Sequence, residues 1–261
     1  MREIRFIKGH GTGNDFLVIP DIDGEITLSE ADVKKMCDRH FGLGADGILR
    51  IVLQGDGFYL MDYRNSDGSL ALMCGNGARV FAAYLYKEKL VAKDEFEFRT
   101  RAGVVKATIH SAELVTVSMP KVEILNKDLL IQHQGFAYTG QAVTAPNPHA
   151  VILVDDLNQV KDLTVAPILT TQGVFDDGVN VEFVQKISNN KVKIKVHERG
   201  SGETLSCGTG ACAVAAVIRN LTGEDLIEVE VAGGSLKVEF INDEILMTGP
   251  VEFVASGVLT I

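Results

Sequence analysis

The chain has 261 residues, of which 46% are hydrophobic, so it can bury a large core in one domain or in two of about half its length. Its 35 acidic residues outnumber the 25 basic ones, and the net charge of -10 disfavours nucleic acid and anionic membranes as partners. The N-terminal residues lack the pattern of a signal peptide, and no apolar run reaches the roughly 18 residues of a membrane span. We therefore expect a cytoplasmic protein that acts on a small molecule.

Short alternating or β-branched runs dominate the chain and predict a sheet-rich α/β or α+β fold. Expected strands include residues 114–117, 150–154 and 192–196, with turns at 21–24 and 188–190. Two segments, 78–85 and 211–218, are too rich in alanine for typical strands and are apolar nearly all round. A helix without a polar face has no solvent side, so we expect each of these helices to lie inside a shell of strands.

The two apolar segments follow matching motifs, CGNGA at 74–78 and CGTGA at 207–211, which are separated by 207 − 74 = 133 positions. The same offset relates Asn14 to Asn147, and residues 98–109 resemble 229–240 at an offset of 131. These matches predict an internal duplication into two pseudo-symmetric lobes. We place the lobe that carries Cys74 at residues 1–118 and the lobe that carries Cys207 at 119–250.

Each of these two cysteines stands where a helix begins. Free backbone N–H groups at a helix N-terminus lower the pKa of a thiol to between roughly 3.5 and 7.5 and can bind a carboxylate. If the lobes face each other across a cleft, two thiols on opposite sides of one carbon can remove a proton and return it with inversion. The expected donors to the developing enediolate are backbone groups of Gly75, Asn76, Gly208 and Thr209.

Other interpretations of the cysteines exist. A cysteine in an Ala/Gly-rich turn is often a small buried residue, and this is the expectation for Cys37 and Cys212, which lack a mate at the repeat offset. Cys207, Cys212 and a histidine would make a zinc site, although with poor spacing along a helix. The glycine-rich turns would suit a pyridoxal phosphate enzyme, but no Schiff-base lysine can be singled out. A thiol redox protein is a further alternative.

Several longer motifs carry a family resemblance. They are FIKGHGTGNDF at 6–16, FGLGADG at 41–47, YRNSDGSLALMCGNGAR at 63–79, NPHAV at 147–151, DGVNVEFV at 177–184 and HERGSGETLSCGTGA at 197–211. In these segments the chain resembles the diaminopimelate epimerase family from end to end. The resemblance implies interconversion of LL- and meso-diaminopimelate by an acid and base pair of cysteines, without pyridoxal phosphate or a metal. The meso product feeds lysine and peptidoglycan synthesis.

The resemblance also implies the architecture. Each lobe is expected to be an antiparallel sheet or barrel rolled around a central helix, with the active site in the cleft between the lobes. Residues 251–261 are expected to return to the first lobe, and family members are commonly homodimers.

The resemblance further assigns substrate-lining residues: Asn14, Asn65, Asn147, Asn180, Glu198 and Arg199. A glutamate and an arginine suit the ammonium and the distal carboxylate of such a substrate. His149 and Glu198 match residues that tune the thiols in the family. Pro146, Ala150 and Gly47 depart from the usual family pattern, which affects fine substrate contacts. A racemase of another amino acid, such as proline or histidine, is an alternative that would not need Arg199.

Overall fold

The computed structural model describes residues 3–260, which form two compact units. The first unit runs to Val117 and takes up the chain again from Gly249, and the second unit is Ser118–Thr248. Strands dominate both units, as the sequence predicts, and each unit has one long helix. No helix in the described part of the chain is both long and apolar enough to cross a bilayer.

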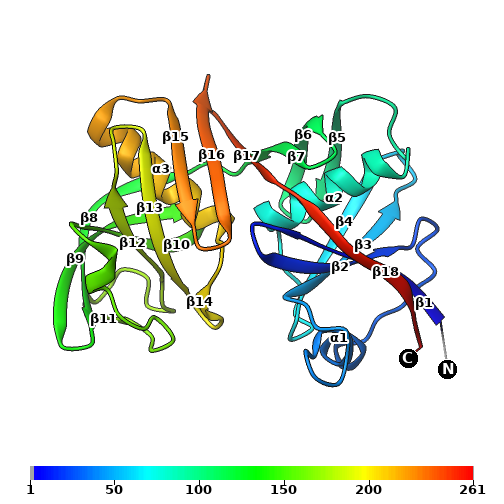
Figure 1. Ribbon diagram of the computed structural model, residues 1–261, viewed down its shortest axis with the longest axis horizontal. Helices are drawn as coiled ribbons and strands as arrows, with labels where there is room; N and C mark the ends of the chain where they lie inside the picture. Colours follow the sequence, from blue (N-terminus) through cyan, green and yellow to red (C-terminus); the bar gives the residue numbers. More distant parts are fainter. Residues whose placement is uncertain (1–2, 261) are drawn as a thin grey trace. The chain divides into compact units, whose positions relative to one another are not determined.

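The first unit packs its strands around the helix α2, which is cyan in Figure 1. Strands β1 and β18 are antiparallel neighbours, so the last strand of the described chain lies beside the first. Its elements are β1 (Glu3–Gly11), β2 (Asn14–Pro20), α1 (Glu30–Cys37), β3 (Gly47–Leu53), β4 (Tyr59–Asn65), α2 (Gly75–Lys87), β5 (Glu95–Thr100), β6 (Gly103–Ser111), β7 (Leu114–Met119, which crosses into the second unit) and β18 (Glu252–Thr260).

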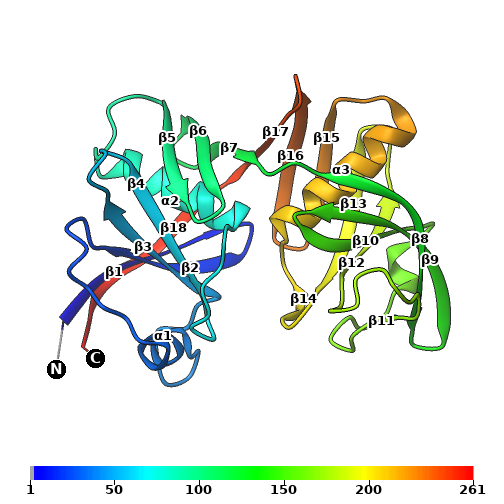
Figure 2. The same ribbon diagram turned by 180° about the vertical axis from the view of Figure 1, so that it is seen from behind.

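The second unit repeats this plan around the helix α3, which Figure 2 shows lying along its strands. Its elements are β8 (Glu123–His133), β9 (Phe136–Ala145), β10 (Asn147–Val154), the 3₁₀ helix η1 (Leu157–Gln159), β11 (Ile168–Leu169), β12 (Asn180–Lys186), β13 (Lys191–Glu198), β14 (Gly202–Thr204), α3 (Gly208–Thr222), β15 (Leu226–Val231), β16 (Gly234–Ile241) and β17 (Glu244–Pro250, which crosses into the first unit).

The strand registers of the two units match at the offset read from the sequence. In the first unit β2 pairs with β3 in parallel and β3 with β4 antiparallel, and in the second unit β10, β12 and β13 do the same. The equivalent ladder pairs are Phe16 with Gly47 and His149 with Asn180, then Ile48 with Arg64 and Val181 with His197. Every member shifts by 133, for example 180 − 47 = 133, which confirms the predicted duplication.

The two central helices contain the predicted segments 78–85 and 211–218 and are buried along most of their length. Alanine and glycine keep these helices thin, so strands can approach them from several sides. Helix α3 ends at Gly223, whose φ of 79° lies in the left-handed region that glycine adopts without strain.

Candidate active site

Cys74 is the N-cap of α2, and its backbone is extended rather than helical. Its sulfur accepts a hydrogen bond from the Gly77 amide at 3.4 Å, while Ala78 N donates the first helical bond to Cys74 O at 2.8 Å. The amides of Gly75 and Asn76 precede that first helical bond and lie in the first turn of the helix. A thiol and helix amides with partial positive charge thus meet at one point.

Amide side chains surround Cys74. The thiol donates to Asn14 Oδ1 at 3.6 Å, and Asn76 Nδ2 donates to the same oxygen at 3.3 Å. Asn14 Nδ2 in turn donates to Asp46 Oδ2 at 2.7 Å, which fixes the orientation of the Asn14 amide. The structure therefore joins Cys74 to Asn14 and Asn76, two of the predicted site residues.

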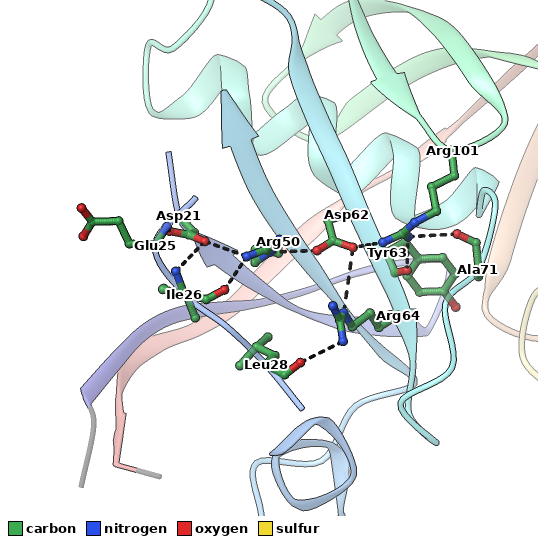
Figure 3. Close-up of polar contacts among 10 residues, drawn as sticks. All are labelled: Asp21, Glu25, Ile26, Leu28, Arg50, Asp62, Tyr63, Arg64, Ala71 and Arg101. Carbon is green, nitrogen blue, oxygen red and sulfur yellow. Dashed lines mark hydrogen bonds and ion pairs between the residues drawn. The ribbon is translucent and has the colours of Figure 1, made fainter. Parts of the chain in front are cut away.

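A buried charge cluster fixes the loop that leads to Cys74 (Figure 3). Asp62 on β4 is 2% exposed and accepts hydrogen bonds from Arg50, at 2.8 Å, and from Arg101. Arg101 also donates to the carbonyl oxygens of Tyr63, at 2.8 Å, and Ala71, at 3.2 Å. Since Ala71 lies three residues before Cys74, the cluster links the approach to α2 with the sheet.

Cys207 is the N-cap of α3 and repeats the geometry of Cys74. Gly210 N donates to its sulfur at 3.4 Å, and Ala211 N donates to Cys207 O at 2.9 Å. Thr209 Oγ1 lies 3.5 Å from the same sulfur. The backbone amides of Gly208 and Thr209 thus occupy the same first-turn positions as those of Gly75 and Asn76.

The protonation of Cys207 differs from the prediction. Burial raises the pKa of its thiol well above the usual range, and the charges of Glu198 and Glu182 raise that pKa further. The hydrogen bonds from Thr209 and Gly210 act in the opposite direction but do not compensate. The expectation of an acidified thiol is therefore wrong for Cys207, because loss of solvation and nearby carboxylates outweigh the helix N-terminus.

Glu198, at the end of β13, is the carboxylate that contacts Cys207. It accepts hydrogen bonds from the Thr204 hydroxyl, at 2.5 Å, and from the Cys207 thiol. Burial raises the pKa of the Glu198 carboxyl, and these two hydrogen bonds partly offset that rise. The protonation state of Glu198 therefore affects the pKa of Cys207, and that of Cys207 affects the pKa of Glu198.

His149 lies in the same part of the second unit, on β10. It is fully buried, and its Nδ1 lies 2.7 Å from Oε1 of Glu182, which is fully buried on β12. Both residues belong to the core around the first turn of α3 rather than to the protein surface. The structure thus links His149 to a glutamate that the sequence analysis did not single out.

The remaining predicted residues lie at the ends of strands. Asn180 Oδ1 accepts from the backbone N–H of Arg199 at 2.9 Å, while Arg199 Nη1 donates to the Asp177 carbonyl at 2.8 Å. Asn65 accepts from the Tyr63 hydroxyl at 2.7 Å. Asn147 is exposed at the start of β10. The side chain of Asn65 thus contacts Tyr63 and Ser69, and the Arg199 guanidinium donates to the Asp177 carbonyl.

Comparison with known proteins decides the family. A family model described as diaminopimelate epimerase matches residues 6–125 and 141–254. Diaminopimelate epimerase of Streptomyces coelicolor is 42% identical, covering 97% of this chain and 94% of the relative. The enzyme of that name from Corynebacterium glutamicum strain R is 41% identical, covering 97% of each chain.

This chain belongs to the diaminopimelate epimerase family. The resemblance inferred from the motifs is thereby confirmed, as is the assignment of the chain to the isomerases.

Solved structures support the fold of this diaminopimelate epimerase family member. A PhzF-family phenazine biosynthesis protein from Bacillus anthracis has a TM-score of 0.73 at 13% identity, with 100% of each chain covered. A hydroxyproline epimerase from Agrobacterium vitis, solved with trans-4-hydroxy-L-proline, has a TM-score of 0.68 at 14% identity, covering 99% of this chain and 92% of that one. At such low identity these likenesses concern the architecture alone.

Three polar residues near the cysteines of this diaminopimelate epimerase family member were missed from sequence: Asp46, Glu182 and Thr204. Glu182 left a usable signal in the sequence. Since 182 − 133 = 49, it aligns with Leu49, so a charged residue in one repeat replaces an apolar residue in the other. Asp46 and Thr204 sit in turn-rich segments where such residues are common, so nothing marked them. Cys37 and Cys212 are buried, and burial raises the pKa of Cys37 to about 12.

Proposed function

We propose that this protein interconverts LL- and meso-diaminopimelate, with Cys74 and Cys207 as the two groups that transfer the α-proton. The observation that carries the proposal is the repeated N-cap: each cysteine receives a first-turn amide hydrogen bond at 3.4 Å, at equivalent positions of a duplicated fold. Family membership supplies the substrate. Inversion then requires the two thiols to act on opposite faces of the same carbon.

In this mechanism one cysteine is a thiolate and the other a thiol at the start of each turnover. The thiolate removes the α-proton, and the thiol donates its own proton to the opposite face, so the two cysteines exchange states. Negative charge that develops on the substrate carboxylate is stabilised by the first-turn amides of Gly75, Asn76, Gly208 and Thr209. The reverse reaction uses the same groups in exchanged roles.

The assigned binding residues complete the proposal. Asn14, Asn65, Asn147 and Asn180 supply amide contacts, Glu198 receives an ammonium group, and Arg199 binds the distal carboxylate. His149 and Glu198 tune the thiols, for which the contacts of Glu198 with Cys207 and of His149 with Glu182 give support. Arg199 donates from Nη1 to the Asp177 carbonyl, which orients a guanidinium that has further N–H groups for the distal carboxylate.

Incubation with LL-diaminopimelate in heavy water tests the function. The meso product should carry deuterium at the inverted carbon, because the donated proton comes from a thiol that has exchanged with solvent. Proline and hydroxyproline, offered in parallel, should retain their α-hydrogen. Exchange of the α-hydrogen of those amino acids, without exchange in diaminopimelate, would show that the protein is a racemase of another amino acid.

The biological setting belongs to the same proposal. We place the protein in the cytoplasm as a homodimer that acts on a small molecule in lysine and peptidoglycan precursor synthesis, without nucleic acid or membrane as a partner. The net charge of -10 supports the lack of polyanionic partners. Light scattering coupled to size exclusion should give the mass of two 28.2 kDa chains, and a single-chain mass would remove the dimer.

A further inference from the structure

The two units fill the space beneath the first helical turn with different chemistry. A methyl group placed on Gly77 would lie 3.2 Å from Leu49 Cδ2 and 3.4 Å from Phe16 Cζ. At the equivalent Gly210 it would lie 2.6 Å from Glu182 Oε1. We call this space the first-turn slot: it is apolar beneath α2 and holds a carboxylate beneath α3.

The repeat offset makes this comparison specific. Glu182 stands at the ladder position of Leu49, since 182 − 49 = 133, and its partner His149 stands at that of Phe16, since 149 − 16 = 133. The same backbone frame thus holds a Leu and Phe pair in one unit and a Glu and His pair in the other. Packing alone does not require a buried carboxylate, because an apolar pair of similar volume is often equally or more stable.

The contacts connect this pair with Cys207. Glu182 and His149 are both 0% exposed, with Oε1 and Nδ1 2.7 Å apart. Glu182 Oε1 also lies against Gly210, whose N–H donates to the Cys207 sulfur. Glu182 Oε2 and His149 Nε2 have no hydrogen-bond partner among residues 3–260. Leaving two such atoms unsatisfied is costly, so the pair is hard to explain as a stabilising feature.

We propose that Glu182 is a positioning residue for Cys207, whose buried negative charge keeps that cysteine in the thiol form before substrate binds. His149 holds the carboxylate in place through the hydrogen bond at Nδ1. Cys207 then enters the reaction as the proton donor, and it becomes a thiolate by giving its proton to the α-carbon. The inference concerns the thiols assigned under the proposed function and rests on that assignment for its role in catalysis.

Glu182 is one of several ionisable groups around α3. Glu198 on β13 bonds the thiol directly, and Glu182 on β12 acts through space; both raise the pKa of Cys207. His133 on β8 is also buried, but its Nε2 lies 3.3 Å from the Lys161 carbonyl. Because Glu182 does not bond the thiol, removing its charge leaves the direct contacts of Cys207 in place.

The test uses two variants and one control. Glu182→Gln removes the charge and keeps the shape and an acceptor for His149. The double variant His149→Phe with Glu182→Leu installs the pair that the first unit already carries in its slot. Glu224→Gln, at an exposed site just beyond the other end of α3, removes an equal charge away from the slot.

The first measurement is the rate of iodoacetamide reaction at Cys207 across pH 6 to 10, followed by peptide mass spectrometry. Glu182→Gln and the double variant should react about tenfold faster than the parent at pH 8, which corresponds to one pKa unit. The control should match the parent. The second measurement is the alkaline limb of kcat/KM for diaminopimelate, which should move to lower pH in Glu182→Gln.

Rates within twofold of the parent for both variants, over the whole pH range, would overturn the proposal. If Glu182→Gln does not fold, as judged by circular dichroism, the alkylation rate of the double variant alone tests the proposal. The alkylation assay needs no substrate, so it tests the role of Glu182 even if the parent protein fails to epimerise diaminopimelate. Failure of that activity with a shifted alkylation profile would refute the proposed function and leave this inference standing.

Discussion

The first turns of α2 and α3 share one geometry and differ in charge. Around Cys74 the polar partners include the Asn14 side-chain amide, and a fully buried Arg79 follows on the same helix. Around Cys207 the partners are acidic, with Glu198 in contact and Glu182 beneath the turn. Asn65 and Glu198 are even equivalent in the repeat, since 198 − 65 = 133.

The comparison shows how a duplicated fold serves a reaction that needs two unlike groups. Duplication supplies two N-capping thiols in the same geometry, whereas a two-base inversion requires one thiolate and one thiol at any moment. Substitutions at a few equivalent positions, such as Glu182 in place of Leu49, change the charge around the second thiol without disturbing the strands. The predictions below test how far the two turns are alike and where they diverge.

The largest effect should come from the cysteines themselves. Cys74→Ala and Cys207→Ala should each lower kcat for diaminopimelate inversion about a thousandfold, because each removes a general acid or base. Cys212→Ala, a neighbouring buried thiol without an assigned role, is the control and should retain activity. Kinetics of both directions would measure the loss, and more than a tenth of parental activity in either variant would break the proposed equivalence of the two turns.

The next effect concerns the sheets behind the turns. Asp62→Ala should lower the free energy of unfolding by about 3 kcal/mol, because Arg101 loses its ion pair with a buried carboxylate and Arg50 is left with Asp21. The equivalent residue of the second unit is Lys195, since 195 − 62 = 133, and it donates to two carbonyls, those of Leu157 and Val160. Lys195→Met should cost about 1.5 kcal/mol. Denaturant unfolding measures both, and equal costs would contradict the comparison.

Glycine replacement tests the first-turn slot. Gly210→Ala should lower the free energy of unfolding by about 2 kcal/mol, since the new methyl would lie 2.6 Å from the fixed Glu182 carboxylate. Gly77→Ala meets the end of the Leu49 side chain at 3.2 Å, and the better helix propensity of alanine offsets the crowding. Its effect should stay within about 1 kcal/mol. Thermal unfolding of the two variants measures both effects. A larger loss of stability in Gly77→Ala than in Gly210→Ala would contradict the assigned contents of the two first-turn slots.

The smallest effect is a pH dependence. Burial raises the pKa of Glu198 above the 4.5 of a free glutamate, so ionisation costs more in the folded protein than in the unfolded chain. Its contribution to stability is therefore full below pH 4.5 and is lost as pH rises through the folded pKa. Glu198→Gln, which gives the second unit an amide as in the first, should gain stability over the parent between pH 5 and 8. A constant difference across that range would exclude the pKa shift.

Much of the fold was accessible from sequence because a duplication leaves the same pattern twice. Alanine-rich segments without a polar face predicted buried helices, and the offset of 133 predicted two pseudo-symmetric lobes. The CGxGA motif predicted both N-caps, since cysteine followed by glycine permits the tight first turn. The slip from 133 to 131 beyond the helices was visible too, and the ladder keeps it: Leu60 with Arg99 corresponds to Lys193 with Glu230.

The protonation of the site was less accessible. A helix N-terminus acidifies a thiol, but burial acts in the opposite direction, and the balance at Cys207 depends on its burial and on two carboxylates that only the folded chain brings near it. The contact between Asn14 and Cys74 joins residues 60 positions apart, and only the folded sheet brings them together. The signal for Glu182 is that this charged residue lies in an apolar strand and aligns with Leu49 in the other repeat.

The pairing of β18 with β1 has a consequence for how the protein is made. The second unit is one continuous stretch of chain, so it can fold as soon as it leaves the ribosome. The first unit must wait, because its strand β1 gains the antiparallel neighbour β18 only after the whole second unit has been made. The sheet of the first unit is thus closed by a strand made long after its partner, and loss of β18 would leave the edge of β1 open to other chains.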